Sequence, residues 1–199
     1  MNSKNIKRYI PSKASLWGVD DFIRNQHNIA ERWLRKGNET EDIYSKFFFY
    51  FAGFNAIYFQ WGVINKIDGS QQEKIQNLLE QLGDSKAKEI IDEVKNEVEY
   101  FCRRKPIQKM NRRIGEKLMV GYSDDGIRYQ KILQDEYRPA LERIVSLGQI
   151  LYLVRSNLVH GSKEESGSGD DFEIIKSSIE PLKVLLTEGI TWSKKQCPF

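Results

Sequence analysis

The chain has 199 residues, a length typical of one domain and sufficient for a hydrophobic core without disulfide or metal support. Hydrophobic residues make up 40% and charged residues 30%, with 5 Pro and 14 Gly, a composition that excludes collagen-like, low-complexity and disordered chains. The 31 Lys and Arg against 28 Asp and Glu give a net charge of +3, too small a surplus to indicate nucleic-acid binding by itself.

Helical spacing of apolar residues predicts the elements of the first half of the chain. Residues 1–18 carry scattered lysines without periodicity, and we expect an N-terminal arm there. Helices are expected over about 19–35, 41–66, 70–82 and 85–104. Gly37 is expected to end the first helix and Thr40 to cap the second. The Asp68-Gly69 turn and Pro106 close later helices.

The second half begins with a weak pattern over 107–126. Helices are expected over 127–137, over about 139–159 with Pro139 in the first turn, and over 171–189 with a kink or restart at Pro181. The composition of 161–171, GSKEESGSGDD, indicates a flexible loop, and 191–199 is expected to be a C-terminal tail. No alternating run long enough for a strand appears. The sequence therefore predicts one all-α bundle of about five to seven helices over 19–190.

The segment 47–64, FFFYFAGFNAIYFQWGVI, is 18 residues long, near the lower limit for a membrane-spanning helix. Asn55 and Gln60 interrupt it, aromatic residues dominate over Leu and Ile, and its flanks lack a Lys and Arg bias. These features favour a buried core helix over a membrane span. The ten aromatic residues between Tyr44 and Trp61 are likewise expected to pack in the core rather than to stack on single-stranded bases.

The cysteines and the N-terminus indicate the compartment. Cys102 and Cys197 are far apart and form no CxxC motif, so neither a disulfide framework nor a metal or redox site is expected. The N-terminal MNSKNIKRYIPSK is positively charged, but no apolar segment follows it, and no secretory signal is expected. We expect a cytoplasmic protein that uses no cofactor and does not bind a membrane.

The expected helix over 139–159 has one charged residue on its apolar stripe. The stripe consists of Leu141, Ile144, Val145, Gly148, Leu151, Tyr152, Leu158 and Val159. Arg155 occupies the position seven residues after Gly148. Because an unpaired buried charge is too costly to keep, Arg155 requires an anion. That anion is either a core carboxylate or a bound ligand, unless the side chain extends to solvent at the helix end.

His160 follows Arg155 after four intervening residues and stands directly before Gly161. The only other histidine, His27, lies among apolar positions of the first expected helix, where a hydrogen-bonded core histidine is the favoured interpretation. His160 is therefore the candidate for proton transfer near neutral pH. Positions five apart on a helix point about 140° apart, so Arg155 and His160 converge only if the helix ends or distorts between them.

The residues around this pair resemble a known family. LYLVRSNLVHG, residues 151–161, read with the aromatic stretch YSKFFFYFAGFNAIYFQW, is similar to the HEPN superfamily of helical bundles, whose hallmark is an Arg followed after four to six residues by a His. The resemblance implies a symmetric homodimer with a composite, metal-independent endoribonuclease site. It also implies roles for such proteins as toxins or antiphage defence effectors, with RNA as substrate and an antitoxin or regulatory protein as a further partner.

The same resemblance suggests the roles of the site residues. His160 would transfer protons, Arg155 would hold the phosphate, and Asn157 or Ser156 would position the phosphate or the imidazole. The family often has Asn directly after the Arg, whereas here Ser156 holds that place and Asn157 the next. No Tyr closely follows His160, so regulation by nucleotide addition to such a Tyr is not indicated.

A second candidate feature is a run of six cations within eleven residues that contains no acid. Its members are Arg103, Arg104, Lys105, Lys109, Arg112 and Arg113. Such a run is either a solvated face or a contact with the RNA backbone, which would make binding salt-dependent.

Two functions remain open beside the endoribonuclease. The first is a non-catalytic HEPN-like dimerisation or RNA-binding module, and the second is an all-α scaffold subunit that uses an aromatic surface for protein contacts. No cluster of carboxylates and histidines at metal-ligand spacing appears, which disfavours a two-metal nuclease.

Overall fold

The computed structural model describes residues 18–107, 109–111, 121–159 and 170–196. These residues form eight helices and two short strands. In chain order the elements are α1 (Val19–Glu39), α2 (Ile43–Ile64), α3 (Gln71–Glu80), α4 (Gly83–Glu93), α5 (Lys95–Arg103), β1 (Lys109–Asn111), β2 (Gly121–Ser123), α6 (Asp125–Gln134), α7 (Ala140–Val159) and α8 (Asp170–Gln196). The predicted all-α class is confirmed.

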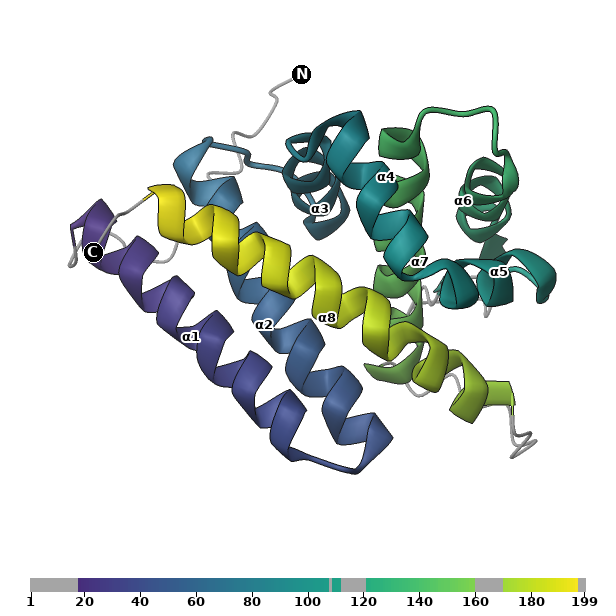
Figure 1. Cartoon of the computed structure of the whole chain (residues 1–199), viewed down its shortest axis with the longest axis horizontal. Coiled ribbons are helices and arrows are strands. Elements are labelled where there is room, and N and C mark those ends of the chain that lie inside the picture. The colour runs from purple at the N-terminus through teal and green to yellow at the C-terminus, as the bar shows by residue number, and fades with distance from the viewer. Residues whose placement is uncertain (1–17, 108, 112–120, 160–169, 197–199) are drawn as a thin grey trace, which may run out of the picture.

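Two groups of helices share one core (Figure 1). In the first, α2 packs against both α1 and α8, and α8 lies across α2. In the second, α7 packs against α3, α4 and α6. Contacts of α8 with α5 and α7, and of α2 with α3, join the two groups. The end of α7 that carries Arg155 lies beside the aromatic helix α2, because the guanidinium of Arg155 contacts the ring of Phe51.

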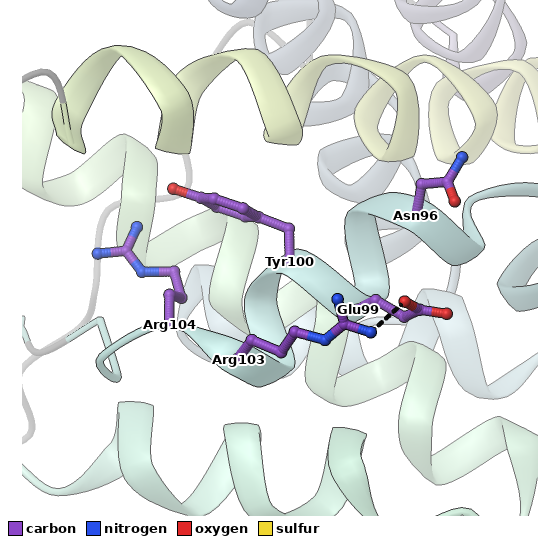
Figure 2. A pocket seen from close by; sticks show the side chains of 5 residues that line it. All are labelled: Asn96, Glu99, Tyr100, Arg103 and Arg104. Carbon is purple, nitrogen blue, oxygen red and sulfur yellow. Dashed lines mark hydrogen bonds and ion pairs between the residues drawn. The ribbon is translucent and has the colours of Figure 1, made fainter.

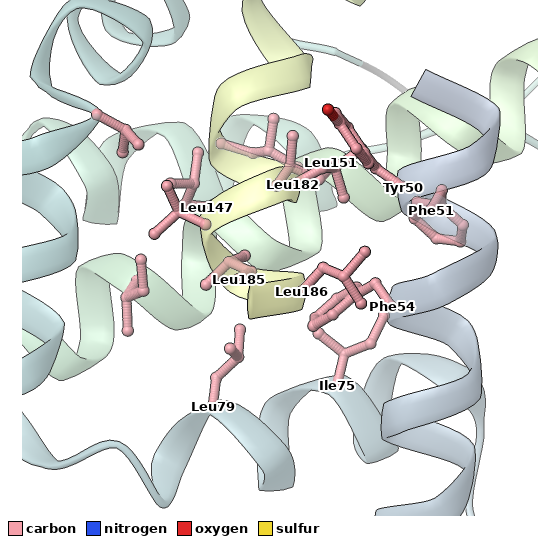
Figure 3. Close-up of a cluster of buried hydrophobic side chains, with 14 of the residues drawn as sticks. Tyr50, Phe51, Phe54, Ile75, Leu79, Leu147, Leu151, Leu182, Leu185 and Leu186 are labelled. Carbon is pink, nitrogen blue, oxygen red and sulfur yellow. The ribbon is translucent and has the colours of Figure 1, made fainter. Parts of the chain in front are cut away.

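The aromatic segment forms the core helix α2, as predicted. Its buried side chains, Phe51 and Phe54 among them, belong to one hydrophobic cluster with leucines of α7 and α8 (Figure 3). Within the described ranges α2 is the one helix that is long and apolar enough to cross a membrane. In this fold, however, 61% of its most apolar 18-residue stretch is buried against the rest of the protein. A core helix can be this long and apolar because its neighbours, rather than lipid, cover its apolar surface.

The boundary between α1 and α2 differs from the prediction at two residues. Asp42, rather than Thr40, caps α2: its carboxylate accepts a hydrogen bond from the Ser45 amide at 2.7 Å. Hydrogen bonding first to the side chain and then to the backbone of Ser45 lowers the pKa of Asp42. Gly37 does not end α1 but lies inside it, where a Cβ atom would overlap the ring of Tyr50. The glycine is therefore a packing residue that lets α2 approach, and α1 continues to Glu39.

The described ranges contain eight helices where five to seven were expected for the chain, because the segment expected as one helix over 85–104 is two. At Val94 the backbone leaves helical geometry, with φ −103° and ψ 30°, and separates α4 from α5. The Val94 amide still donates to the Ile90 carbonyl at 3.0 Å, and its own carbonyl accepts from the Val98 amide at 3.0 Å. The side chain of Val94 is fully buried, so the bend keeps the apolar faces of both helices on the core.

The last helix is longer and more continuous than predicted. α8 runs through Pro181 without a break, and the buried leucines that follow the proline hold the helix on the core despite the lost hydrogen bond. It continues to Gln196 and so includes most of 191–199, which was expected to be a tail. Trp192 explains this extension, since its ring packs edge-on against Trp61 of α2 with centroids 4.7 Å apart.

Two short strands occur where the sequence predicted none. β1 and β2 pair antiparallel, with Met110 opposite Tyr122. Three residues per strand are too few to produce a recognisable alternation. The expected N-terminal arm, apart from Gly18, and nearly all of the expected loop over 161–171 lie outside the described residues.

Candidate functional site

Arg155 lies near the C-terminal end of α7 and faces α2. Its guanidinium carbon is 5.7 Å from the ring centroid of buried Phe51, a cation–π contact. Burial raises the pKa of Tyr58, and the positive charge of Arg155 opposes that rise. Arg155 is partly exposed, so its side chain contacts the aromatic core without being closed off from solvent.

The sequence left open a core carboxylate as the partner of Arg155. Within the described ranges Arg155 makes no ion pair with a carboxylate. The ring of Phe51 and the partial exposure to water together stabilise its charge. Of the alternatives that the sequence left open, a core carboxylate partner is therefore not observed in this part of the chain. The guanidinium retains N–H donors for an anionic ligand.

The other site residues of α7 diverge from Arg155. Ser156 is 5% exposed and points into the core, so it is not placed to contact a phosphate. Asn157 is partly exposed and lines a cavity that Arg155 does not line. This divergence follows from the helical repeat, because successive residues point about 100° apart. His160 lies outside the described residues.

The cavity beside Asn157 has a volume of about 190 Å³ and lies where three helices end. It is lined by Tyr44, Ile107, Val154, Asn157, Leu158, Asp171, Ile174 and Ile175. The first turn of α2, the last turn of α7 and the start of α8 contribute to this lining (Figure 1). Sequence reasoning did not identify Tyr44 or Asp171 as site residues, since one was assigned to the core and the other to a loop.

His27 is a core residue, as predicted. It is 4% exposed, and its Nδ1 atom lies 3.2 Å from the hydroxyl of Ser193. That hydroxyl donates to the side-chain oxygen of Gln60 at 2.9 Å, and Nε2 of His27 lies 3.3 Å from a carboxylate oxygen of Glu31. The order Glu, His, Ser resembles a nucleophilic triad, but Ser193 is fully buried, where no substrate reaches it. This chain of contacts joins α1, α2 and α8.

The first two arginines of the basic run, Arg103 and Arg104, lie at the end of α5 (Figure 2). Arg103 is highly exposed, but its guanidinium is 2.7 Å from the carboxylate of Glu99, one helical turn earlier. The guanidinium of Arg104 lies 5.8 Å from the ring centroid of Tyr100. Together with Asn96 these residues line an open cavity of about 440 Å³. Glu99 stands just before the run and offsets the charge of Arg103, which the run by itself did not reveal.

The remaining cations are described only in part. Lys105 is exposed, and Lys109 forms part of β1. The side chain of Lys109 and all of Arg112 and Arg113 lie outside the described residues.

An amide on α6 holds the start of the basic run in place. The Nε2 atom of buried Gln130 donates to the carbonyl oxygens of Phe101 and Arg104, each at 2.7 Å. These carbonyls belong to the C-terminal end of α5, where helical hydrogen bonds run out. Gln130 therefore fixes the direction in which the chain leaves α5 at Arg104.

The titratable groups of the described ranges form no metal site: no three His, Cys, Asp or Glu side chains gather there in a way that could hold an ion. Cys102 is a free, partly buried thiol, and burial raises its pKa. Cys197 lies outside the described residues.

Comparison with known proteins gives no match. No protein-family model, no curated protein and no solved structure matches this chain. The candidate function therefore depends on Arg155, His160 and the surfaces around them.

Proposed function

We propose that this protein is a metal-independent endoribonuclease of the HEPN type that acts as a homodimer, in the role of a toxin or antiphage defence effector. The observation that carries the proposal is the state of Arg155, a partly exposed cation held on Phe51 that makes no ion pair with the described residues. The guanidinium fork matches two phosphate oxygens, and its N–H donors remain available for them. His160, five residues further along, supplies a group that titrates near neutrality.

The reaction needs two proton transfers at oxygen and no redox step. The ribose 2′-hydroxyl loses its proton to one imidazole and attacks the adjacent phosphorus. The bond from phosphorus to the 5′-oxygen breaks, and a second, protonated imidazole gives its proton to that oxygen. The products are a 2′,3′-cyclic phosphate and a 5′-hydroxyl. Arg155 stabilises the negative charge that develops on the phosphoryl oxygens.

A dimer supplies the second imidazole, because each chain has one candidate His160 while His27 is buried in the core. The surface at the end of α7 supports this arrangement. Tyr44 and Leu158, which line the cavity there, are 47% and 39% exposed, and Phe48 and Phe172, close in sequence to the lining residues Tyr44 and Asp171, are 56% and 43% exposed. Exposed apolar groups around one cavity are typical of an interaction surface. A two-fold contact at this surface would bring the two α7 ends together.

Cleavage of labelled RNA in excess EDTA tests the proposal. We expect wild-type protein to cut RNA with and without EDTA and to leave 2′,3′-cyclic phosphate ends, which acid treatment opens. Sedimentation of the same sample is expected to give the mass of two chains. Loss of cleavage on chelation would reject the metal-independent mechanism. Binding without cleavage would favour instead the non-catalytic dimerisation or RNA-binding module.

Neutralising Arg112 and Arg113, the last two cations of the basic run, is expected to lower the affinity for RNA and to make that affinity less dependent on salt. In single strands each phosphate contact contributes about 0.7 to the slope of log K against log salt, so the double change Arg112→Gln with Arg113→Gln should reduce that slope by about 1.4. Filter binding from 50 to 300 mM salt measures it. Arg103→Gln is the matched control and should change the slope less, because Glu99 already pairs with Arg103. An unchanged slope in the double variant would remove the run from the RNA site.

A further inference from the structure

A groove between α1 and α2 lies outside the site described above. Its volume is about 440 Å³, within the range of small-ligand sites. It is lined by Gln26, Ile29, Trp33, Ala52, Asn55, Ala56, Phe59 and Gln71. The two helices run side by side (Figure 1), and the small Ala52 and Ala56 leave room between the larger side chains.

The aromatic rings of the groove are held in place. The ring of Phe59 packs edge-on against Phe22 with centroids 5.9 Å apart and is 37% exposed. Trp33 is stacked on Phe49 with centroids 5.3 Å apart. Fixed, partly exposed rings of this kind are the surfaces on which unpaired bases stack. Phe59 is thus an exception to the expectation that the aromatic residues of α2 serve only the core.

The polar groups of the groove are amides. Within the described ranges the side chains of Gln26 and Asn55 make no hydrogen bond, and Gln71 accepts one from the Tyr58 hydroxyl at 3.4 Å. Each amide offers both donors and an acceptor, the combination that pairs with the edge of a nucleobase. No carboxylate is among the described residues that line the groove.

Lysines adjoin both rings. The ammonium of Lys74 lies 5.5 Å from the ring centroid of Phe59, and that of Lys36 lies 5.0 Å from that of Trp33. Cations beside amides and aromatic rings complement a base that carries a phosphate. By itself the groove is much smaller than a stable protein interface, which takes about 20 to 30 residues on each side.

We infer that this groove binds an unpaired nucleobase with its attached phosphate. The base stacks on Phe59, bonds to the amides of Gln26 and Asn55, and places its phosphate beside Lys74. The source is either a nucleotide of the RNA strand outside the cleavage position or a free nucleotide. Only the first source rests on the proposed endoribonuclease function.

Two probes distinguish the sources: adenosine 5′-monophosphate, and a fluorescein-labelled oligoadenylate of eight nucleotides with 2′-O-methyl groups, which cannot be cut by attack of a 2′-hydroxyl. We expect wild-type protein to bind the oligonucleotide, measured by fluorescence anisotropy. Quenching of tryptophan fluorescence by the monophosphate would identify free nucleotide as a further ligand. If the monophosphate causes no quenching while the oligonucleotide binds, the groove is assigned to a nucleotide of the RNA strand.

Two variants test the groove itself. Phe59→Ala is expected to weaken oligonucleotide binding roughly 5- to 100-fold, the range found when a base loses its stacking partner. Asn55→Glu, a change at an exposed groove position, replaces an amide that would bond to the base with a carboxylate that repels the negatively charged nucleotide, and it is expected to weaken binding at least tenfold without unfolding the chain. The matched controls Tyr137→Ala and Gln76→Glu make the same kinds of change on exposed surface outside the groove and should bind like wild type.

Oligonucleotide affinity that is unchanged in both Phe59→Ala and Asn55→Glu would overturn the inference. The same result together with a loss of dimer in sedimentation would assign the groove to protein contact instead. Because the oligonucleotide cannot be cut, its binding is measured independently of cleavage. If the protein cleaves no RNA but binds the oligonucleotide in a way that depends on Asn55, the proposed function is rejected and the inference about the groove is retained.

Discussion

Arg155→Ala is expected to lower the rate of RNA cleavage roughly 10²- to 10³-fold, the usual cost of removing one group that stabilises charge in the transition state. His160→Ala is expected to lower it by roughly 10²- to 10⁴-fold, because the reaction loses its proton-transfer group. Initial rates on labelled RNA in EDTA measure both. In cells we expect expression of the wild-type protein to slow growth more than expression of either variant.

Three comparisons separate a catalytic role of these residues from a structural one. Arg155→Lys keeps the charge but loses the fork, so its rate should lie between those of wild type and Arg155→Ala. Arg138→Ala is the matched control, since Arg138 pairs with Glu142 at the other end of α7, and its rate should stay near that of wild type. Sedimentation and thermal unfolding must show that each variant is folded and dimeric. Equal cleavage by folded Arg155→Ala, His160→Ala and wild type would reject the site.

The pH dependence of cleavage gives an independent test of the paired imidazoles. One His160 must be neutral to accept a proton and its partner must be protonated to donate one. The rate is therefore expected to rise and then fall with pH, with a maximum near the ordinary histidine pKa of about 6.5. A rate that only rises with pH would show that no protonated imidazole takes part.

Much of the fold follows from the sequence because most helices bury one apolar stripe. The periodicity predicted α2, α3 and α7 with boundaries close to those observed, and the apolar neighbours of His27 predicted its burial. Contacts between helices decided what the pattern did not show. Glycine is typical of a helix end, yet Gly37 lies inside α1. A glycine is needed there because the ring of Tyr50 occupies the space that a Cβ atom would take.

The candidate site was predictable to a smaller extent. The place of Arg155 on the apolar stripe marked it as unusual, but the stripe did not reveal that its partner is Phe51, an aromatic ring on another helix, rather than a carboxylate. Composition assigned Tyr44 to the core, whereas the helix start leaves it about half exposed beside Asn157. These relations depend on how α2 and α7 meet, which no local pattern records.

Phe54→Ala is expected to lower the free energy of unfolding by about 3–5 kcal/mol, the usual cost of removing a buried phenylalanine ring. Phe54 is fully buried in the core beside Phe51 (Figure 3). It packs edge-on against Phe51 and Tyr58, with ring centroids 6.5 Å and 5.6 Å away. Chemical denaturation measures the loss. Tyr137→Ala removes a ring of similar size from a fully exposed position and should change the free energy of unfolding by less than about 0.5 kcal/mol.

The same substitution connects the core to the site. Phe51 contacts both Phe54 and the guanidinium of Arg155, so a cavity at position 54 lets the ring of Phe51 move and withdraws the support of the cation. We therefore expect the folded Phe54→Ala protein, assayed well below its unfolding temperature, to cleave RNA more slowly than wild type. Phe54→Leu retains most of the apolar volume and should lose less of both stability and rate. A loss of less than about 1 kcal/mol in Phe54→Ala would show that this ring does not fill the core.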